Sequence, residues 1–229
     1  MIKKYSYLLF DLDGTITDSC EGIYKSFAYA LDCYGIHVDS LESLRPVVGP
    51  PLKESFMTMF GFDEKKADDA VAKYRERYTE TGIYENRVYD GAEQMLSKLK
   101  NAGYKIALAT SKPEFFARRI LEYFHLDGYF DYITGATFDG KIKEKEDVIL
   151  HILSVLDIKD RKTALMIGDR KHDLIGAQKL GLDAMGVLYG YGSREELGEY
   201  PHIYLADTPG DVTNYILHGG NIEHYGGEK

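Results

Sequence analysis

The sequence predicts an α/β fold: a doubly wound, Rossmann-like parallel sheet with a smaller all-helical domain inserted after its first strand. Two observations carry this prediction. Short, continuously apolar runs alternate with helical patterns, and continuous hydrophobicity is typical of strands that a parallel sheet buries on both faces. Residues 19–82 break the alternation because they show helical periods only. We therefore place the α/β core at residues 1–17 and 84–218, the helical domain at 18–83 and a frayed tail at 219–229.

The predicted strands are short apolar runs. The first, residues 5–10, ends at Asp11, and the next strong run, residues 104–109, ends at Thr110. Weaker runs complete the predicted sheet, at residues 131–135, 164–168, 184–188 and 202–205.

Helical patterns with recognisable ends separate these runs. Residues 91–102 stop at Gly103, and residues 113–124 begin with Pro113, which suits an early helical position because its missing N–H would have no partner there. Further core helices are predicted at residues 146–156 and 172–180. The inserted domain adds three helical segments, each closed by a glycine, at residues 23–34, 51–60 and 67–78.

The composition of the 229-residue chain is ordinary for a globular protein, with 44% apolar residues and a formal net charge of −9. That charge argues against a nucleic-acid surface, because the densest basic stretch, residues 141–145, is interrupted by Glu144. No apolar run approaches the ~20 residues of a membrane span, and no signal-peptide pattern is present. Cys20 and Cys33 are predicted on one helix, roughly 20 Å apart and too distant for a disulfide. We expect a cytoplasmic protein that binds neither nucleic acid nor membrane, as a monomer or homodimer.

Two aspartates directly follow the first predicted strand, in the motif DLDGT at residues 11–15. Ligands of open α/β sheets bind at the carboxyl ends of the strands, so Asp11 and Asp13 are expected at that edge. Gly14 allows a tight turn between them and the following chain. The alternative interpretation is an Asx turn without chemistry, which the motif alone would favour.

A second acidic pair, Asp169 and Asp173, follows the run at residues 164–168. Carboxylates from two strand ends can converge on a hard divalent cation. Mg²⁺ typically takes one or two protein carboxylates and leaves its other positions to water and substrate phosphate oxygens. The alternative is capping of the following helix, which acidic side chains also perform, and it is the stronger alternative for Asp173.

Polar groups that suit a phosphate follow two other strands. Thr110 and Ser111 end the run at residues 104–109, where a hydroxyl and the N–H groups of the next helix can hold phosphate oxygens. An ST turn is the alternative there. Lys145 precedes a helix and can neutralise phosphate and carboxylates together, with Lys141 and Lys143 as competing candidates.

The order of these motifs resembles the haloacid dehalogenase superfamily of phosphatases. The motifs are DLDGTITDS, a strand ending in ATSK, a lysine before a helix, and IGDRKHD, and the helical block is similar to the inserted cap of that superfamily. The resemblance covers nearly the whole chain. It implies magnesium-dependent hydrolysis of small phosphate monoesters through an aspartyl-phosphate.

The resemblance also implies roles for individual residues. Asp11 is similar to the nucleophile and Asp13 to the general acid/base, while Thr110 would hold the phosphoryl group. Asp169 would bind Mg²⁺ with Asp11 and the backbone carbonyl of Asp13. Lys145 would bridge the phosphoryl group and the nucleophile. Asp173 would bind the metal directly or contact one of its ligands. Many members carry Lys-Pro-x-Pro-Asp at the lysine; here the sequence is KEKEDVI, which favours Lys145 and leaves Lys143 as an alternative.

Residues 45–53, RPVVGPPLK, are similar to the cap loop that often faces the active site. Arg45 or Lys53 could hold a substrate carboxylate or second phosphate, and a rigid loop leading into a helix is the equally weighted alternative. The phosphoglycolate phosphatase and 5′-nucleotidase-like branch is the most similar. Two other functions stay open, a phosphomutase of the β-phosphoglucomutase type and a catalytically silent binding module.

Overall fold

The computed structural model describes residues 4–219 and divides the chain into two compact units. One unit comprises Met1–Ile16 and Val88–Lys229, and the other is Thr17–Arg87. The predicted tail at 219–229 falls largely outside the described residues. Gly219 is described, and it ends the last helix in a left-handed conformation.

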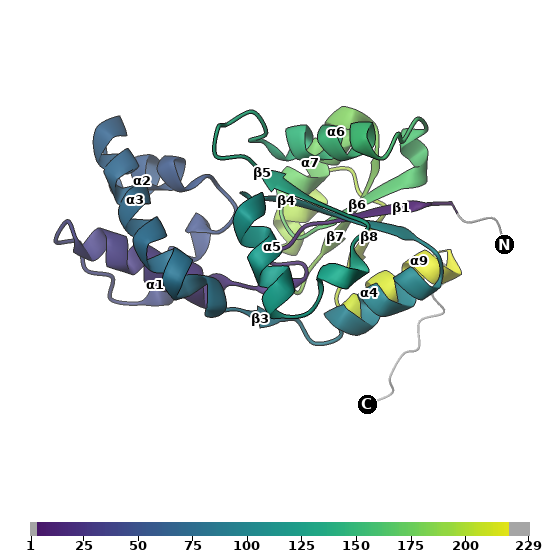
Figure 1. The fold of residues 1–229 in the computed structure, drawn as a ribbon, viewed down its shortest axis with the longest axis horizontal. Helices are drawn as coiled ribbons and strands as arrows, with labels where there is room; N and C mark the ends of the chain where they lie inside the picture. Colours follow the sequence, from purple (N-terminus) through teal and green to yellow (C-terminus); the bar gives the residue numbers. More distant parts are fainter. Residues whose placement is uncertain (1–3, 220–229) are drawn as a thin grey trace. The chain divides into compact units, whose positions relative to one another are not determined.

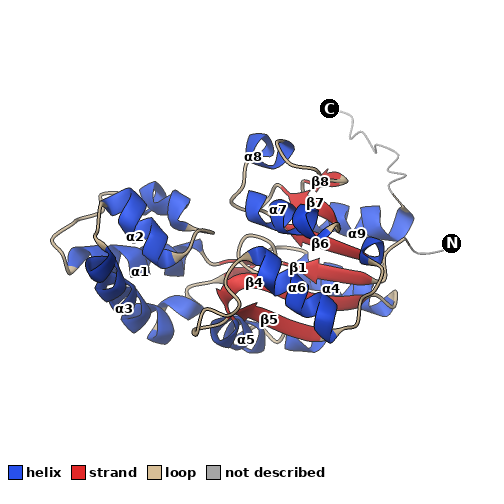
Figure 2. Ribbon diagram, turned by 90° about the horizontal axis from the view of Figure 1, so that it is seen from above, coloured by secondary structure: helices blue, strands red, loops and turns tan. Residues whose placement is uncertain are grey.

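The first unit is built on a six-stranded parallel sheet, which confirms the predicted α/β class (Figure 2). The strand order is β5-β4-β1-β6-β7-β8, with β1 near the middle. Each predicted run forms a strand close to its expected position, as β1 (Tyr7–Phe10), β4 (Lys105–Pro113), β5 (Tyr132–Ala136), β6 (Ala164–Gly168), β7 (Asp183–Val187) and β8 (Tyr204–Ala206). Leu9 of β1 lies in register with Ala107 of β4 and Met166 of β6, so three apolar side chains form one row across the sheet.

Helices cover both faces of this sheet (Figure 1). α6 (Lys145–Val155) and α7 (Lys171–Leu180) pack on one face, where Leu9, Met166, Ile149 and Leu174 share a buried apolar core. The opposite face carries three helices, α4 (Ala92–Asn101), α5 (Glu114–Tyr123) and α9 (Pro209–His218). Because successive residues of a strand point to opposite faces, both faces need apolar side chains, which explains the continuous runs.

Two helices of this unit were not predicted, α8 (Arg194–Gly198) and α9. The start signal of α9 is nevertheless present in the sequence. Thr208 caps it by accepting a hydrogen bond from the Asp211 N–H, and Pro209 is its first residue. Short 3₁₀ turns, which a helical period does not reveal, occupy Asp127–Tyr129 and Arg161–Thr163.

The second unit is helical, with α1 (Cys20–Asp32), α2 (Leu52–Phe60) and α3 (Glu64–Glu80). Its core is aromatic: the Phe27 ring lies 4.6 Å from the Phe56 ring and 5.2 Å from the Tyr74 ring, measured between centroids. Gly61 ends α2 with a φ of 66°, the left-handed conformation expected of a glycine cap. Cys20 and Cys33 lie at opposite ends of α1 as free thiols, which agrees with the predicted absence of a disulfide.

Shorter elements complete this helical unit and its connections. A 3₁₀ helix, η1 (Leu41–Val47), contains Arg45, so the predicted loop over residues 45–53 was wrong at its start. Lys53 lies in α2, as the helix predicted at residues 51–60 implies. A 3₁₀ turn follows α3 at Gly82–Tyr84. The two-residue strands β2 (Thr17–Asp18) and β3 (Arg87–Val88) pair with each other where the chain passes between the units. Within residues 4–219, none of the helices combines the length and apolar character needed to cross a membrane.

Candidate active site

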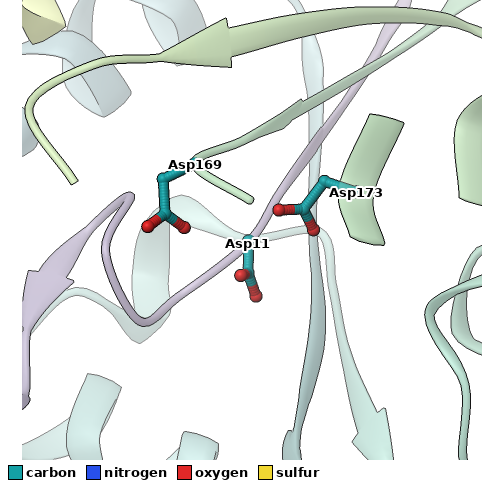
Figure 3. A group of neighbouring side chains, drawn as sticks. All are labelled: Asp11, Asp169 and Asp173. Carbon is teal, nitrogen blue, oxygen red and sulfur yellow. The ribbon is translucent and has the colours of Figure 1, made fainter. Parts of the chain in front are cut away.

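Three carboxylates from separate elements meet at the carboxyl edge of the sheet (Figure 3). Asp11 follows β1, and its N–H donates to the Ile167 carbonyl of β6 at 2.9 Å, so the strand pairing extends to this residue. Asp169 follows β6, and Asp173 is the third residue of α7. Each of the three aspartates offers an oxygen, and these oxygens lie within 4.8 Å of one another. The expectation that the strand ends bring these acids together is therefore correct.

Lys145 lies inside this acidic group. Its Nζ donates to the Ala109 carbonyl at 2.7 Å and lies 2.9 Å from Asp11 Oδ1 and 2.8 Å from Asp173 Oδ1. The side chain is only 4% exposed, whereas that of Lys143 is 64% exposed and pairs with Glu144. Burial thus distinguishes the two lysines that the sequence left as alternatives, and it places Lys145 beside the acids.

The electrostatics of the group show one cation facing three acids. Burial raises the pKa of Asp11 to about 6 against the opposing charge of Lys145, and Asp173 adds to the rise. The pKa of Asp169 is raised well above its ordinary value by burial and by the charges of Asp173 and Asp11. Burial lowers the pKa of Lys145, but the attraction of Asp11 and Asp173 outweighs it, so the net shift is upward and the lysine stays charged.

The remaining negative charge fits a bound cation. Asp11 Oδ1 and Asp173 Oδ1 are buried, and beyond their ion pairs with Lys145 they accept no hydrogen bond from any described residue. One ammonium group therefore serves both oxygens, and three buried carboxylates share a single cation. Hard carboxylate oxygens are the ligand type that Mg²⁺ prefers.

At Gly14, the segment that follows β1 lies close against the Asp169 carboxylate. Its φ of +84° is a conformation that favours glycine, and a Cβ at this position would lie 2.1 Å from Asp169 Oδ2. Gly168 is similarly constrained, because a Cβ there would lie 2.2 Å from Asp173 Cγ. The glycine of DLDGT therefore does more than form a turn: it makes room for a carboxylate of the acidic group.

Replacement of Gly14 by alanine is expected to destabilise the protein and disturb Asp169. A left-handed alanine costs roughly 1–2 kcal/mol, and the contact with Asp169 adds to that cost. Gly181→Ala is a matched control, because Gly181 has a φ of +75° and its Cβ would meet no atom within 4 Å. Denaturant unfolding should show a larger loss of stability for Gly14→Ala than for Gly181→Ala. Equal losses would contradict the close approach to Asp169.

The end of β4 contributes a second charged pair. The strand runs to Pro113, beyond the predicted end at Thr110, so Ser111 and Lys112 lie within it. Thr110 is buried, and its hydroxyl accepts a hydrogen bond from the Lys112 N–H at 3.2 Å. The Lys112 Nζ lies 2.8 Å from Asp13 Oδ2, a contact that the sequence analysis did not anticipate. The Asp13 carboxylate is thus engaged by Lys112 and lies outside the group formed by the other three acids.

A loop after β7, residues 189–192, also reaches the site. The Tyr191 N–H donates to Asp169 Oδ2 at 2.7 Å, and the Tyr189 hydroxyl donates to the Thr15 carbonyl at 3.1 Å. Burial and the nearby Asp169 charge raise the pKa of Tyr189, so its hydroxyl keeps its proton. Sequence reasoning assigned nothing to this segment. Its only signal is the alternation of tyrosine and glycine in YGYG.

Arg45 and Lys53 belong to the helical unit. Lys53 Nζ lies 2.9 Å from Asp68 and 3.1 Å from Glu64, so its charge is shared with two carboxylates of α3. Arg45 lies in the last turn of η1. Their part in substrate binding stays a prediction.

Residues 8–187 match the family described as haloacid dehalogenase-like hydrolase. The chain belongs to this family. A 5′-nucleotidase of Pseudomonas aeruginosa is 46% identical over 205 residues, which are 89% of this chain and 92% of that protein. A crystal structure described as a predicted phosphatase from Clostridium acetobutylicum is 48% identical, with a TM-score of 0.89, over 93% of this chain and 99% of that one.

A third relative has a different name. The tyrosine-protein kinase PtkA of Mycobacterium tuberculosis is 41% identical over 185 residues, which cover 81% of this chain and 62% of that protein. The family match, the 5′-nucleotidase relative and the structure described as a predicted phosphatase indicate a phosphatase of the haloacid dehalogenase-like family, a phosphoric monoester hydrolase. The predicted superfamily and enzyme class are confirmed.

Proposed function

We propose that this haloacid dehalogenase-like phosphatase hydrolyses small phosphate monoesters in a magnesium-dependent reaction in which Asp11 attacks phosphorus. One observation carries the proposal: Asp11 lies at a strand end with Lys145 on one of its oxygens and two further buried acids beside it. A carboxylate held next to a cation suits nucleophilic attack on a phosphate. The carboxylates of Asp169 and Asp173 suit a metal ion.

A phosphate monoester dianion repels an anionic nucleophile, so the site must supply positive charge. Lys145 supplies part of it from its position between Asp11 and Asp173. Asp11, Asp169, Asp173 and the backbone carbonyl of Asp13 are the groups that would hold Mg²⁺. When bound, the ion would offset the charge of the phosphoryl oxygens as a Lewis acid.

The reaction divides into two displacements. An Asp11 carboxylate oxygen forms a bond to phosphorus while the ester P–O bond breaks, and Asp13 donates a proton to the departing alkoxide. Water then attacks the phosphorus of the aspartyl-phosphate, Asp13 accepts its proton, and Asp11 is released as a carboxylate with inorganic phosphate. Lys112 keeps the Asp13 carboxylate in place between the two steps.

The groups that would orient the ester come from several segments. The Thr110 and Ser111 hydroxyls and the backbone at Gly14 would hold oxygens of the transferring phosphoryl group, as phosphate-binding strand and helix ends do. Arg45 or Lys53 would hold a carboxylate or second phosphate of the substrate.

The relatives and the sequence support two first candidates for the substrate. The 5′-nucleotidase relative favours nucleoside monophosphates as first candidates. The resemblance of the sequence to the phosphoglycolate phosphatase branch favours a small carboxylated ester. The test is phosphate release by the purified protein from nucleoside monophosphates, phosphoglycolate, sugar phosphates and pyrophosphate, with and without Mg²⁺. A sugar phosphate that is isomerised without phosphate release would instead establish the phosphomutase. We also predict that the protein binds a small phosphate ester, that it is a monomer or homodimer, and that it does not bind nucleic acid.

Metal removal gives a direct test of the Mg²⁺ dependence. We expect turnover to fall to background in EDTA and to return with excess Mg²⁺. Because the ion would bind only the folded site, Mg²⁺ should also raise the free energy of unfolding, by about 2.7 kcal/mol at 100 times its Kd. Asp169→Asn is the matched variant, and it should lose most of the Mg²⁺-induced shift. Full activity in EDTA would contradict the proposed metal.

A further inference from the structure

We propose that the YGYG loop, residues 189–192, positions the metal-binding carboxylate Asp169 and thereby sets the affinity of the site for Mg²⁺. The loop itself offers no ligand in this proposal. It acts through Asp169, with the Tyr189 hydroxyl and the Tyr191 N–H as its contacts. The inference rests on the metal site of the proposed function.

Direct contacts tie the loop to Asp169. The carboxylate is fully buried and receives the Tyr191 N–H on Oδ2 at 2.7 Å, and the Thr15 hydroxyl lies 3.5 Å from Oδ1. A backbone N–H is a rigid donor, because its direction is set by the chain on both sides. The Tyr191 N–H therefore defines which way the Asp169 carboxylate faces.

Two glycines let the loop approach this closely. A Cβ at Gly190 would lie 2.4 Å from Asp169 Cβ and 2.2 Å from the Gly14 carbonyl oxygen. A Cβ at Gly192 would lie 2.0 Å from the Asp169 carbonyl oxygen. Neither residue is among the glycines with positive φ, so their backbone conformations do not demand glycine. Glycine is required because the neighbouring chain at Gly14 and Asp169 leaves no room for a Cβ.

Tyr189 connects the same loop to the first motif. Its hydroxyl donates to the Thr15 carbonyl, four residues after Asp11, and its ring meets the edge of Tyr89 at a centroid distance of 5.2 Å. The loop after β7 thus holds both the segment after β1 and the segment after β6. A change in it alters the relative placement of Asp11 and Asp169.

The loop is anchored at both of its ends. On one side, the Leu188 N–H donates to the Ala206 carbonyl, which continues the sheet pairing. On the other, Glu196 of α8 accepts hydrogen bonds from Arg170 Nε at 3.0 Å and from the Lys171 N–H at 2.9 Å. Because Arg170 directly follows Asp169, α8 and the metal-binding segment are joined a second time.

Isothermal titration of Mg²⁺ into the full chain tests this inference without substrate. Groups that orient metal ligands typically change metal affinity by about 10- to 100-fold when removed. We expect Gly190→Ala to weaken Mg²⁺ binding within that range and Tyr189→Phe, which deletes one hydroxyl, to weaken it by about tenfold. A second readout is the Mg²⁺-induced rise in Tm, which should shrink in both variants.

Two control variants separate positioning from general packing. Tyr104→Phe removes a buried hydroxyl that donates to the Ile216 carbonyl at 3.2 Å, and Gly128→Ala adds a Cβ that meets no atom within 4 Å. Both should keep the wild-type Kd for Mg²⁺. If Gly190→Ala does not fold, Tyr189→Phe decides the question.

The outcomes distinguish this inference from the proposed function. If wild-type protein binds no Mg²⁺, the metal part of the proposed function fails, and the inference fails with it. If wild-type protein binds Mg²⁺ and Tyr189→Phe binds it equally well while losing stability, the loop is only a packing element, and the inference alone is overturned. Weaker binding by Tyr189→Phe with unchanged binding by Tyr104→Phe supports it.

Discussion

Asp11→Asn is expected to lower kcat for phosphate release by about 10⁴-fold or more, because the amide cannot replace the carboxylate as nucleophile. The variant should still fold. Burial and the neighbouring Asp173 charge both disfavour the ionised form of Asp11 and raise its pKa. A neutral amide at this position removes a buried negative charge and its repulsion from Asp173. Its Mg²⁺-free circular dichroism spectrum and unfolding transition should resemble those of the wild type.

Trapping of the intermediate gives a sharper readout of the same residue. Rapid acid quench of wild-type protein with a ³²P-labelled ester should leave label on the chain, at a peptide that contains Asp11. Asp11→Asn should carry none. Asp131→Asn is a control outside the site, because Asp131 pairs with Lys100 and Lys105 near the start of β4, and it should keep both turnover and labelling. Retained turnover in Asp11→Asn would exclude this nucleophile.

Lys145→Met is expected to show the largest loss of stability among single changes at the site. The lysine is buried between Asp11 and Asp173, and its removal leaves buried carboxylates without their cation. Breaking a buried pair by removing one partner typically costs about 3–5 kcal/mol. Urea unfolding without Mg²⁺ should report this loss, and phosphate release should be abolished as well.

Lys143→Met is the matched control for this change. The two lysines are two residues apart, but the Lys143 side chain is largely exposed and pairs with Glu144. Exposed ion pairs contribute about 0–1 kcal/mol, so this variant should be near wild type in stability and activity. If Lys143→Met were the inactive variant and Lys145→Met the active one, the assignment of the lysine would be wrong. Added Mg²⁺ should stabilise Lys145→Met more than wild type, because the same carboxylates would regain a cation.

The active-site residues that sequence predicted are those that follow strands. β1 and β6 are buried on both faces, so their continuous apolar runs mark where each strand ends, and Asp11 and Asp169 come next in the chain. In a parallel sheet the carboxyl ends share one edge, which is why residues 158 positions apart in the chain could be expected together. The local pattern of apolar runs was therefore enough to predict that Asp11 and Asp169 lie close together.

Residues whose function depends on distant partners were missed or left open. Lys112 follows the predicted strand and received no role from the sequence, yet it lies in β4 with its Nζ on Asp13. The YGYG loop carried no periodic pattern, because its glycines are required by contact with Gly14 and Asp169 rather than by a turn. Such contacts join segments more than 20 residues apart, and no local pattern encodes them.

The sequence by itself determined the α/β class, the inserted helical block and the acids Asp11, Asp169 and Asp173, because buried strands and their ends leave a continuous local pattern. Only the tertiary structure decided between Lys143 and Lys145. The two lysines are two residues apart at the start of the same helix and carry the same charge. They differ in burial, which depends on the Ala109 carbonyl and two carboxylates brought in from other strands and helices. The same holds for the orientation of Asp169, which a backbone N–H from a third strand end determines.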